Sequence, residues 1–237
     1  MTGVPPVAVV IAALNEEGSI ADLLAEIPAT ACGLPVETVV VDDGSTDRTA
    51  EIARAAGVHV HSFPANRGHG VALREGNRIA REDLQADYIV TLDADGQWNP
   101  QEIDGVLEPL VANEADFVIG SRVLGATETD DAFRQAGVHV YAHLVRLLTG
   151  VRVTDTSSGF RALRAEITAR VRQTQVQYQT SELLIGAIFA GYRVTERPIV
   201  MRKRFAGESK KGHNVLYGAR YARVILKTWW RERAATE

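Results

Sequence analysis

The sequence contains only one cysteine, Cys32, and no apolar run that approaches the length of a membrane span. A single cysteine excludes an internal disulfide and fits a reducing cytoplasm. A span needs about 20 predominantly apolar residues. The valine-rich run near the amino terminus ends at Asn15–Glu16–Glu17, and no basic segment precedes it. We therefore expect neither a signal peptide nor a bilayer-crossing helix.

Disorder is also excluded, because 46% of the 237 residues are hydrophobic and 24% are charged. This composition is typical of a soluble protein with a sizeable core, and no linker or repeat interrupts it. The net charge of −4 divides unevenly, with −12 in residues 1–192 and +8 in residues 193–237. The basic tail indicates contact with phosphate groups or an acidic membrane face, or else a solvated basic helix. Charge alone leaves both open.

The first half of the chain alternates valine-rich apolar runs with helical patterns. We predict strands at residues 7–13, 38–41, 58–61, 88–92 and 117–119, and helices at 19–27, 46–56, 71–81 and 100–111. Continuous apolar strands that alternate with helices predict an α/β fold. Its central sheet is expected to be mostly parallel, with helices on both faces.

After Ser121 the alternation becomes less regular. We predict helices at 132–148, 182–190 and 215–231, a short strand or turn at 159–163, and a mobile loop at 203–213. Residues 194–200 are expected to form an edge strand, because Pro198 cannot donate a hydrogen bond to a central ladder. We expect residues 1–237 to form a single domain.

Acidic residues follow the predicted strands where these strands end. The first strand leads into Leu14 and Glu16, the second ends at Asp42 and Asp43, and the stretch "IVTLDADGQWNP" follows later. Carboxyl ends of parallel strands meet at one edge of a sheet, which is where ligands bind in such folds. The sequence therefore predicts an acidic site at this edge.

Within that stretch, Asp93 and Asp95 are two residues apart, so their side chains project to the same side of an extended chain. Neighbouring carboxylates repel each other unless a cation lies beside them. Together with the amide of Gln97, they would suit Mg²⁺ or Mn²⁺. The alternative is that the two aspartates only cap the following turn and helix.

Seven segments together resemble the motifs of family 2 glycosyltransferases, which have the Rossmann-like GT-A fold: "LNEEGSI", "VVVDDGSTDRTAEIA", "NRGHGVALREGNRIA", "IVTLDADGQWNP", "FVIGSR", "TDTSSGFRAL" and "AGYRVTERPIV". Within this family the chain is most similar to dolichol-phosphate mannose synthase and the bacterial polyprenyl-phosphate glycosyltransferases. The similarity extends over about residues 7–212. It implies a nucleotide-sugar-binding half near 1–121, an acceptor-side half near 122–213, and a basic helix at 214–237.

The resemblance also implies roles for individual residues. The residues implied to bind the nucleotide sugar are Leu14, Glu16, Asp42, Asp43, Asp93, Arg204, Ser209 and Lys210. Those implied to bind the metal are Asp93, Asp95 and Gln97. The residues implied to bind the acceptor are Arg122, Arg134, Ser158 and Gly159. The predicted catalytic residues are Asp93, Asp95 and Arg122, together with Glu182 as the base that a hydroxyl acceptor would require. Val138 stands where the similar synthases have a serine. Arg122 either contacts phosphate or pairs with an aspartate.

By this resemblance the protein is an inverting, Mg²⁺- or Mn²⁺-dependent glycosyltransferase. It would move a hexose from a GDP- or UDP-linked sugar, such as GDP-mannose, to polyprenyl or dolichyl phosphate. A phosphate monoester is largely a dianion at neutral pH and needs little help from a base. The alternative is transfer to a saccharide hydroxyl in cell-surface polysaccharide synthesis, which requires a base, and Glu182 is the candidate.

The expected location is cytoplasmic and peripheral, on the inner face of the plasma membrane, through direct contact or a membrane-protein partner. We expect no nucleic-acid partner. Trp229 and Trp230 lie among basic residues, and the pair either forms an interfacial anchor or places one tryptophan in the core. A non-catalytic nucleotide-sugar sensor is disfavoured because it would not need an open metal site. A nucleotidyltransferase is disfavoured because "LNEEGS" lacks its glycine-rich basic loop.

Overall fold

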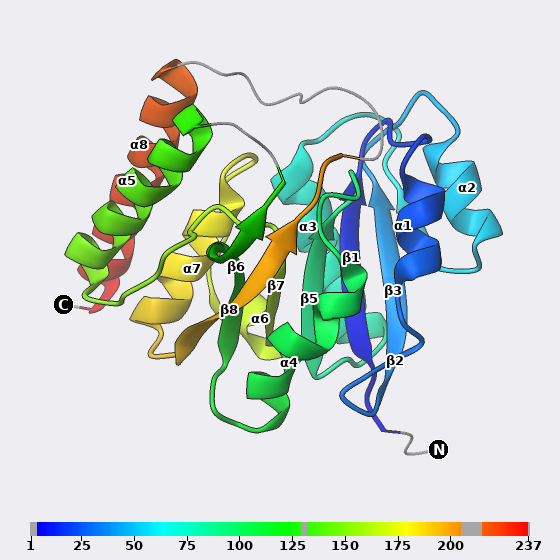
Figure 1. The fold of residues 1–237 in the computed structure, drawn as a ribbon, viewed down its shortest axis with the longest axis horizontal. Helices are drawn as coiled ribbons and strands as arrows, with labels where there is room; N and C mark the ends of the chain where they lie inside the picture. Colours follow the sequence, from blue (N-terminus) through cyan, green and yellow to red (C-terminus); the bar gives the residue numbers. More distant parts are fainter. Residues whose placement is uncertain (1–3, 129–131, 205–214, 237) are drawn as a thin grey trace.

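A computed structural model describes residues 4–128, 132–204 and 215–236, with side chains for the same residues except 132–135, 215–217 and 236. Its strands form one sheet in the order β2-β3-β1-β5-β7-β6-β8, and β4 also pairs with β3 (Figure 1). The strands are β1 (Val7–Ala13), β2 (Thr30–Ala31), β3 (Leu34–Asp42), β4 (His59–Ser62), β5 (Tyr88–Asp93), β6 (Phe117–Thr127), β7 (Arg161–Arg164) and β8 (Val194–Met201).

The sheet is mostly parallel, as predicted. Parallel pairing joins β1 to both β3 and β5, β3 to β4, and β6 to β8. The central exception is β7, which lies between β5 and β6 and is antiparallel to both. The edge position predicted for β8 is confirmed, and so is the tolerance of Pro198 there.

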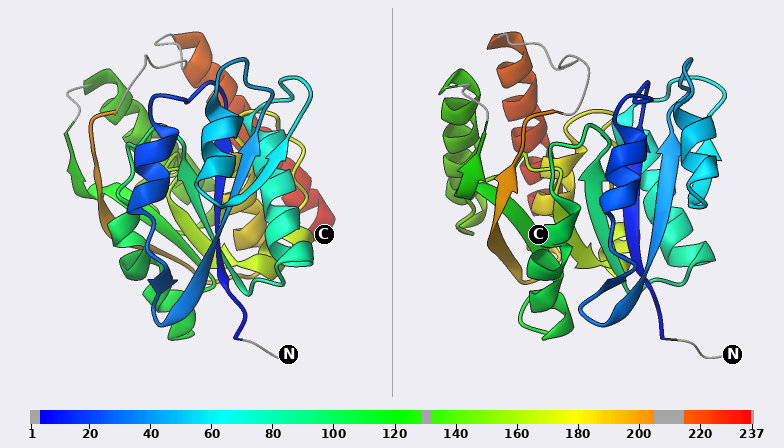
Figure 2. Two further views of the ribbon diagram at one scale, coloured as in Figure 1. Left: turned by 90° about the vertical axis from the view of Figure 1, so that its right-hand side faces the viewer. Right: turned by 45° about the vertical axis from the view of Figure 1, so that its right-hand side comes forward.

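Helices cover both faces of the sheet, as Figures 1 and 2 show. They are α1 (Ile20–Glu26), α2 (Thr49–Ala55), α3 (His69–Arg78), α4 (Ile103–Val111), α5 (Ala132–Thr149), α6 (Ala165–Arg170), α7 (Gln179–Phe189) and α8 (Val215–Thr236). Successive side chains of β1 enter opposite cores because strand side chains alternate between faces. Val10 joins the core under α3, α5, α6, α7 and α8, while Ile11 joins the core under α1, α2 and α4.

Several boundaries differ from the prediction for local reasons. β3 begins earlier than expected because the short β2 pairs with its first residues as a hairpin. The helix predicted at 71–81 ends at Arg78 and continues as a π-helical turn, Ile79–Asp83. Asn99 caps the turn at Pro100–Glu102, accepting a hydrogen bond from Gln101 N over 3.1 Å. The prediction missed α6, and residues 205–213 of the predicted loop lie outside the described residues.

In the described part of the chain, no helix is both long enough and apolar enough to pass through a bilayer.

Candidate active site

The register of β1 with its two neighbours brings the strand-end acids together. Ala13 pairs with Asp42 of β3, and Ala12 pairs with Asp93 of β5. Because β1 lies between these strands, the two aspartates flank its carboxyl end. The predicted gathering of acidic residues at this edge of the sheet is therefore present.

Asp93 contacts one nearby residue, Trp98, and two residues from other parts of the sequence, His69 and Gly159. Its Oδ2 accepts a hydrogen bond from Trp98 Nε1 over 3.0 Å, and His69 Nε2 lies 3.7 Å from its Oδ1. Gly159 packs directly against the carboxylate, and a Cβ added there would lie 2.6 Å from Oδ2. The Asp93 side chain nevertheless keeps 22% of its surface exposed. One face of this carboxylate is thus fixed while another remains accessible to a ligand.

Asp95 faces a cation from the carboxyl-terminal part of the chain. Arg204 Nη2 lies 2.8 Å from Asp95 Oδ2 and 3.5 Å from Gln97 Oε1. Backbone pairing brings them together, because Arg202 N donates to Gln97 O over 2.8 Å, directly beyond the end of β8. Part of the basic tail therefore meets the acidic rim of its own sheet. This contact links the predicted metal ligands to a residue predicted to bind the donor diphosphate.

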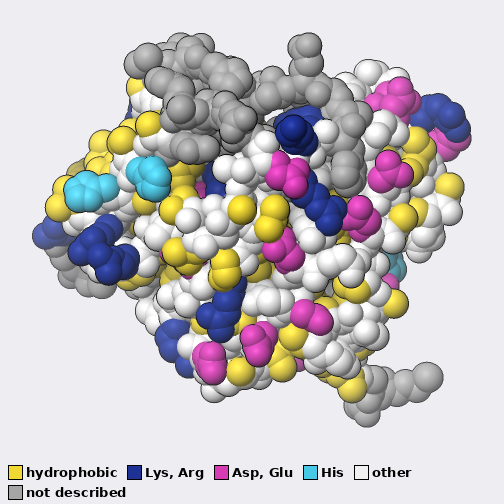
Figure 3. Space-filling model, in the orientation of Figure 1, with side chains coloured by type: hydrophobic (Ala, Val, Ile, Leu, Met, Phe, Trp, Pro, Cys, Tyr) yellow, Lys and Arg dark blue, Asp and Glu magenta, His cyan; other side chains and the backbone are white. Residues whose placement is uncertain are grey.

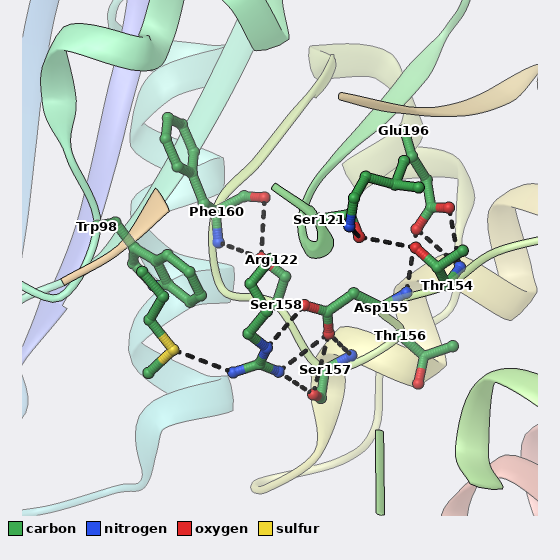
Figure 4. A network of polar contacts seen from close by, with 12 residues as sticks. Trp98, Ser121, Arg122, Thr154, Asp155, Thr156, Ser157, Ser158, Phe160 and Glu196 are labelled. Atoms are coloured by element: carbon green, nitrogen blue, oxygen red, sulfur yellow. Dashed lines mark hydrogen bonds and ion pairs between the residues drawn. The ribbon is translucent and has the colours of Figure 1, made fainter. Parts of the chain in front are cut away.

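Arg122 lies at the centre of a second polar network (Figure 4). Its Nε lies 2.8 Å from Asp155 Oδ2, and its Nη2 donates to Asp155 Oδ1 over 3.0 Å and to Ser157 Oγ over 2.6 Å. Asp155 is fully buried, so this two-pronged ion pair is shielded from water. Two roles were considered for Arg122, contact with phosphate and pairing with an aspartate, and the structure contains the ion pair with Asp155. It anchors the turn that carries Ser158 and Gly159.

Arg161 also stabilises the turn that carries Ser158 and Gly159. Its guanidinium donates to the backbone carbonyls of Ser158 over 2.8 Å and Thr156 over 2.7 Å, and also to Thr180 O. The side chain is buried, and burial lowers the pKa of Arg161 to about 10, with Tyr221, Asp155 and Asp93 opposing the shift. Three carbonyl acceptors compensate for much of the cost of burying this cation.

The residues predicted for the base and ribose are largely occupied by loop contacts. Asp43 accepts hydrogen bonds from the backbone N–H groups of Arg67 and Gly68, at 2.7 and 2.9 Å. Asp42 accepts one from Ser45 N over 2.9 Å. Glu16 accepts one from Ser19 Oγ over 3.0 Å, and Leu14 directly follows β1. These carboxylates fix the shape of the loops around the strand ends.

Glu182 does not face this group of residues, which corrects its proposed role as a base. The residue is fully buried, and its carboxylate accepts hydrogen bonds from Thr174 and Gln175 and forms an ion pair with Arg231 at 2.7 Å. Burial would raise the pKa of Glu182, but these hydrogen bonds outweigh it and leave the pKa lowered. A carboxylate that is enclosed and favoured in its charged form is poorly suited to accept a substrate proton.

The remaining predicted residues fall partly outside the description. Arg134 lies in the first turn of α5, but its side chain is outside the described residues, as are Ser209 and Lys210 entirely. Ser158 is fully buried, and its hydroxyl accepts a hydrogen bond from Phe160 N over 3.2 Å. Ser158 therefore shapes the turn instead of presenting its hydroxyl to solvent.

Three residues of the network were not predicted from sequence: Trp98, Asp155 and Arg161. Each lies within or beside a motif that was recognised, but no role was assigned to it. Arg161 offered a usable indication, since a cation in an otherwise apolar strand segment, "FRAL", requires buried acceptors. The partners of Trp98 and Asp155 arise only when the chain is folded.

Taken together, the rim presents a pair of carboxylates and an amide oxygen, a cation beside them, and a rigid turn from the other half of the sheet. Carboxylate and amide oxygens are ligands for hard divalent ions. The neighbouring guanidinium of Arg204 is suited to phosphate. A divalent ion on the carboxylates and the guanidinium of Arg204 are together suited to hold a diphosphate.

Comparisons with known proteins agree with this chemistry. The family described as "Glycosyl transferase family 2" matches residues 8–172. Dolichyl-phosphate hexose transferase of Haloferax volcanii is 35% identical over 226 residues, which cover 95% of each chain. Undecaprenyl-phosphate 4-deoxy-4-formamido-L-arabinose transferase of Edwardsiella ictaluri is 31% identical over 229 residues, covering 94% of this chain and 68% of that one.

Among solved structures, the chain is similar to glucosyl-3-phosphoglycerate synthase from Mycobacterium tuberculosis in complex with Mn²⁺, UDP and glucosyl-3-phosphoglycerate. The TM-score is 0.72 at 22% identity, over 96% of this chain and 80% of the other. This likeness shows that the chain has the GT-A fold. The extent of the family match and the two relatives go further: the chain belongs to glycosyltransferase family 2.

Proposed function

We propose that the protein transfers a hexose from a nucleotide sugar to polyprenyl phosphate, with inversion at the anomeric carbon. The bond between the sugar's anomeric carbon and the nucleoside diphosphate breaks, and the diphosphate leaves with the electron pair. An oxygen of the acceptor phosphate forms the new bond to that carbon. The observation that carries the proposal is the contact of Gly159, from the acceptor-side turn, with Asp93 of the carboxylate pair. It supports a donor site and an acceptor site that meet at one point.

Asp93, Asp95 and Gln97 fit a divalent ion that is shared with the donor. Within the described residues, no group of three or more His, Cys, Asp or Glu side chains forms a closed metal site. Mg²⁺ sites commonly use one or two carboxylates and complete the shell with substrate phosphates and water. A bound Mg²⁺ or Mn²⁺ would neutralise charge on the departing diphosphate. Arg204, 2.8 Å from Asp95, would contribute a second positive charge to that group.

The surroundings of Glu182 favour a phosphate acceptor over a saccharide hydroxyl. A hydroxyl acceptor needs a base in the site, and the carboxylate predicted for that role is buried against Arg231. A phosphate monoester with a second pKa near 6 is already largely ionised at neutral pH. The two relatives have polyprenyl-phosphate substrates in their names, which supports the same choice.

The test is a panel of labelled GDP- and UDP-sugars incubated with the protein, polyprenyl phosphate and Mn²⁺ or Mg²⁺. Label should move into the organic phase with one donor and only when a divalent ion is present. Label that appears only on an added glycan would instead support the saccharide acceptor. Nucleotide-sugar hydrolysis without transfer would contradict both readings.

Asp95→Asn is the matched variant because it keeps the shape of the side chain and removes the charge. We expect turnover to fall at least 100-fold, in the range seen when a group that stabilises developing charge is lost. Glu51→Gln, an exposed carboxylate on α2 that pairs with Arg48, is the control and should leave turnover unchanged. Full activity in Asp95→Asn would refute the assignment of the metal site.

A further inference from the structure

α5 and α8 pack against each other along one side of the molecule (Figures 1 and 2). The rings of Tyr141 and Tyr221 have centroids 4.5 Å apart, and Trp229 Nε1 donates to Leu148 O over 2.7 Å. Since earlier residues of one helix meet earlier residues of the other, the helices run in the same direction. Trp229 is therefore part of the packing between helices, whereas the adjacent Trp230 is 71% exposed.

The outer faces of these two helices expose large hydrophobic side chains. Val140 and Leu147 of α5 are 62% and 74% exposed, and Leu226 and Trp230 of α8 are 46% and 71% exposed. Leu147 and Trp230 are the two most exposed large hydrophobic residues of those whose side chains are described. Residues seven apart or four apart share one side of a helix, so each pair forms part of a stripe.

Basic residues accompany these stripes, and acidic residues do not. Exposed positions of the two helices include His139, His143, Arg146, Arg220, Arg223, Lys227 and Arg233. The sequence of α5 contains no Asp or Glu. Glu232, the acidic residue of α8, is partly buried and forms an ion pair with Arg231 at 2.6 Å. Figure 3 shows hydrophobic, histidine and Lys/Arg side chains gathered over α5, on the left. We call the exposed sides of both helices the α5/α8 face.

We propose that the α5/α8 face docks the protein on the surface of an anionic lipid bilayer. Its hydrophobic side chains would enter the interface while the basic ones contact lipid phosphates, as in interfacial amphipathic helices. The positive face complements an anionic leaflet although the chain as a whole carries −4. The preference for a bilayer over another partner rests on the proposed function, because a polyprenyl phosphate acceptor resides in a membrane.

A second copy of the chain is a poorer occupant of the same face. A two-fold dimer places identical patches against each other, so Arg223 and Lys227 of one copy would meet the same positive row on the other. Like charges in a closed interface oppose association. Anionic lipid headgroups instead carry the negative charge that complements Arg223 and Lys227.

The position of the face also gives the site access to a membrane-bound acceptor. Both helices begin at the end of the molecule where β5, β6 and β8 end (Figure 1). The carboxylate pair lies at that same end, with Asp93 as the last residue of β5 and Asp95 two residues further on. A protein docked through α5 and α8 would therefore hold its strand-end rim beside the headgroups.

The experiment measures binding to vesicles of phosphatidylglycerol and phosphatidylcholine by flotation. Each Lys or Arg near an anionic surface contributes roughly fivefold in partition, so Arg223→Gln/Lys227→Gln should bind about 25-fold more weakly. Leu147→Ser/Trp230→Ser should also weaken vesicle binding. The loss should be clearest at high salt, where the hydrophobic contribution to binding remains. Arg48→Gln/Arg54→Gln on and beside α2 makes the same charge change at a distance, and Val111→Ser on α4 removes an exposed hydrophobic residue. Both controls should bind like the wild type.

Turnover of a short, water-soluble polyprenyl phosphate separates docking from catalysis. We expect the α5/α8 variants to retain it while they lose vesicle binding. Vesicle binding by the wild type without any turnover would refute the proposed function and leave docking intact. No vesicle binding by the wild type, or equal binding by all variants, would overturn the docking proposal. It would also be overturned by a wild-type dimer that ignores vesicles and becomes monomeric in the same variants.

Discussion

Replacing Gly159 by alanine tests whether the turn that carries Ser158 and Gly159 fixes the position of Asp93. The added Cβ would lie 2.6 Å from Asp93 Oδ2 and 2.8 Å from its Cγ, whereas ordinary contacts begin near 3.4 Å. The carboxylate would have to move by roughly 0.8 Å, because close-packed atoms leave no other space. A displacement near 1 Å of a positioning group typically costs about 100-fold in rate. We therefore expect kcat/KM to fall about 100-fold, together with a higher Mn²⁺ requirement.

The loss should be specific to the site, because Gly159 lacks a positive φ and the change to alanine does not strain the backbone. Asp93 is partly exposed and can rotate, so unfolding by urea should change by no more than about 1 kcal/mol. Gly105→Ala on α4 is the control, since its Cβ would meet no atom within 4 Å. If Gly159→Ala retained kcat/KM within about threefold of the wild type, the turn would not control the carboxylate.

Three further predictions concern the buried polar groups. Glu182→Ala should lower the free energy of unfolding by about 2–3 kcal/mol, because the N–H groups of Thr174 and Gln175 lose their acceptor and Arg231 loses one of its two carboxylate partners. Since folding lowers the pKa of Glu182 below its ordinary 4.5, its stabilisation is present above pH 4.5 and is lost as the pH falls. The wild type should then lose stability on acidification more steeply than Glu182→Gln. Arg161→Met should cost about 3 kcal/mol in urea unfolding, because three buried carbonyls lose their donor. Arg122→Lys should lower kcat/KM at least tenfold at unchanged charge, since lysine cannot form the two-pronged pair with Asp155; wild-type kinetics would show that this pair is dispensable.

The strand order along the chain and the acidic rim were predictable because both depend on local sequence. Valine-rich runs that alternate with helical patterns identify strands buried on both faces, and β1 was predicted at its observed bounds. Asp42 and Asp93 follow such runs, so the parallel arrangement alone brings them to one edge. Neither inference required knowledge of which distant residues meet.

The partners of these acids were not predictable, since they depend on contacts between residues far apart in the chain. Arg204 reaches Asp95 only because the backbone beyond β8 pairs with the loop after β5. Glu182 was the candidate base from sequence, yet its helix packs against α8 and buries it beside Arg231. Periodicity indicates which side of a helix is apolar, but it does not indicate which donor will reach a buried carboxylate.

The antiparallel strand β7 explains why the two halves of the site meet at all. Parallel strands end at the rim, so a parallel β7 would place the turn before it at the opposite edge of the sheet. Because β7 runs antiparallel between β5 and β6, it begins at the rim where they end. The turn that precedes Arg161 therefore lies against Asp93. Arg122 of β6 holds this turn in place through its ion pair with Asp155. One reversed strand thus brings the turn that carries Gly159 against the carboxylate of Asp93.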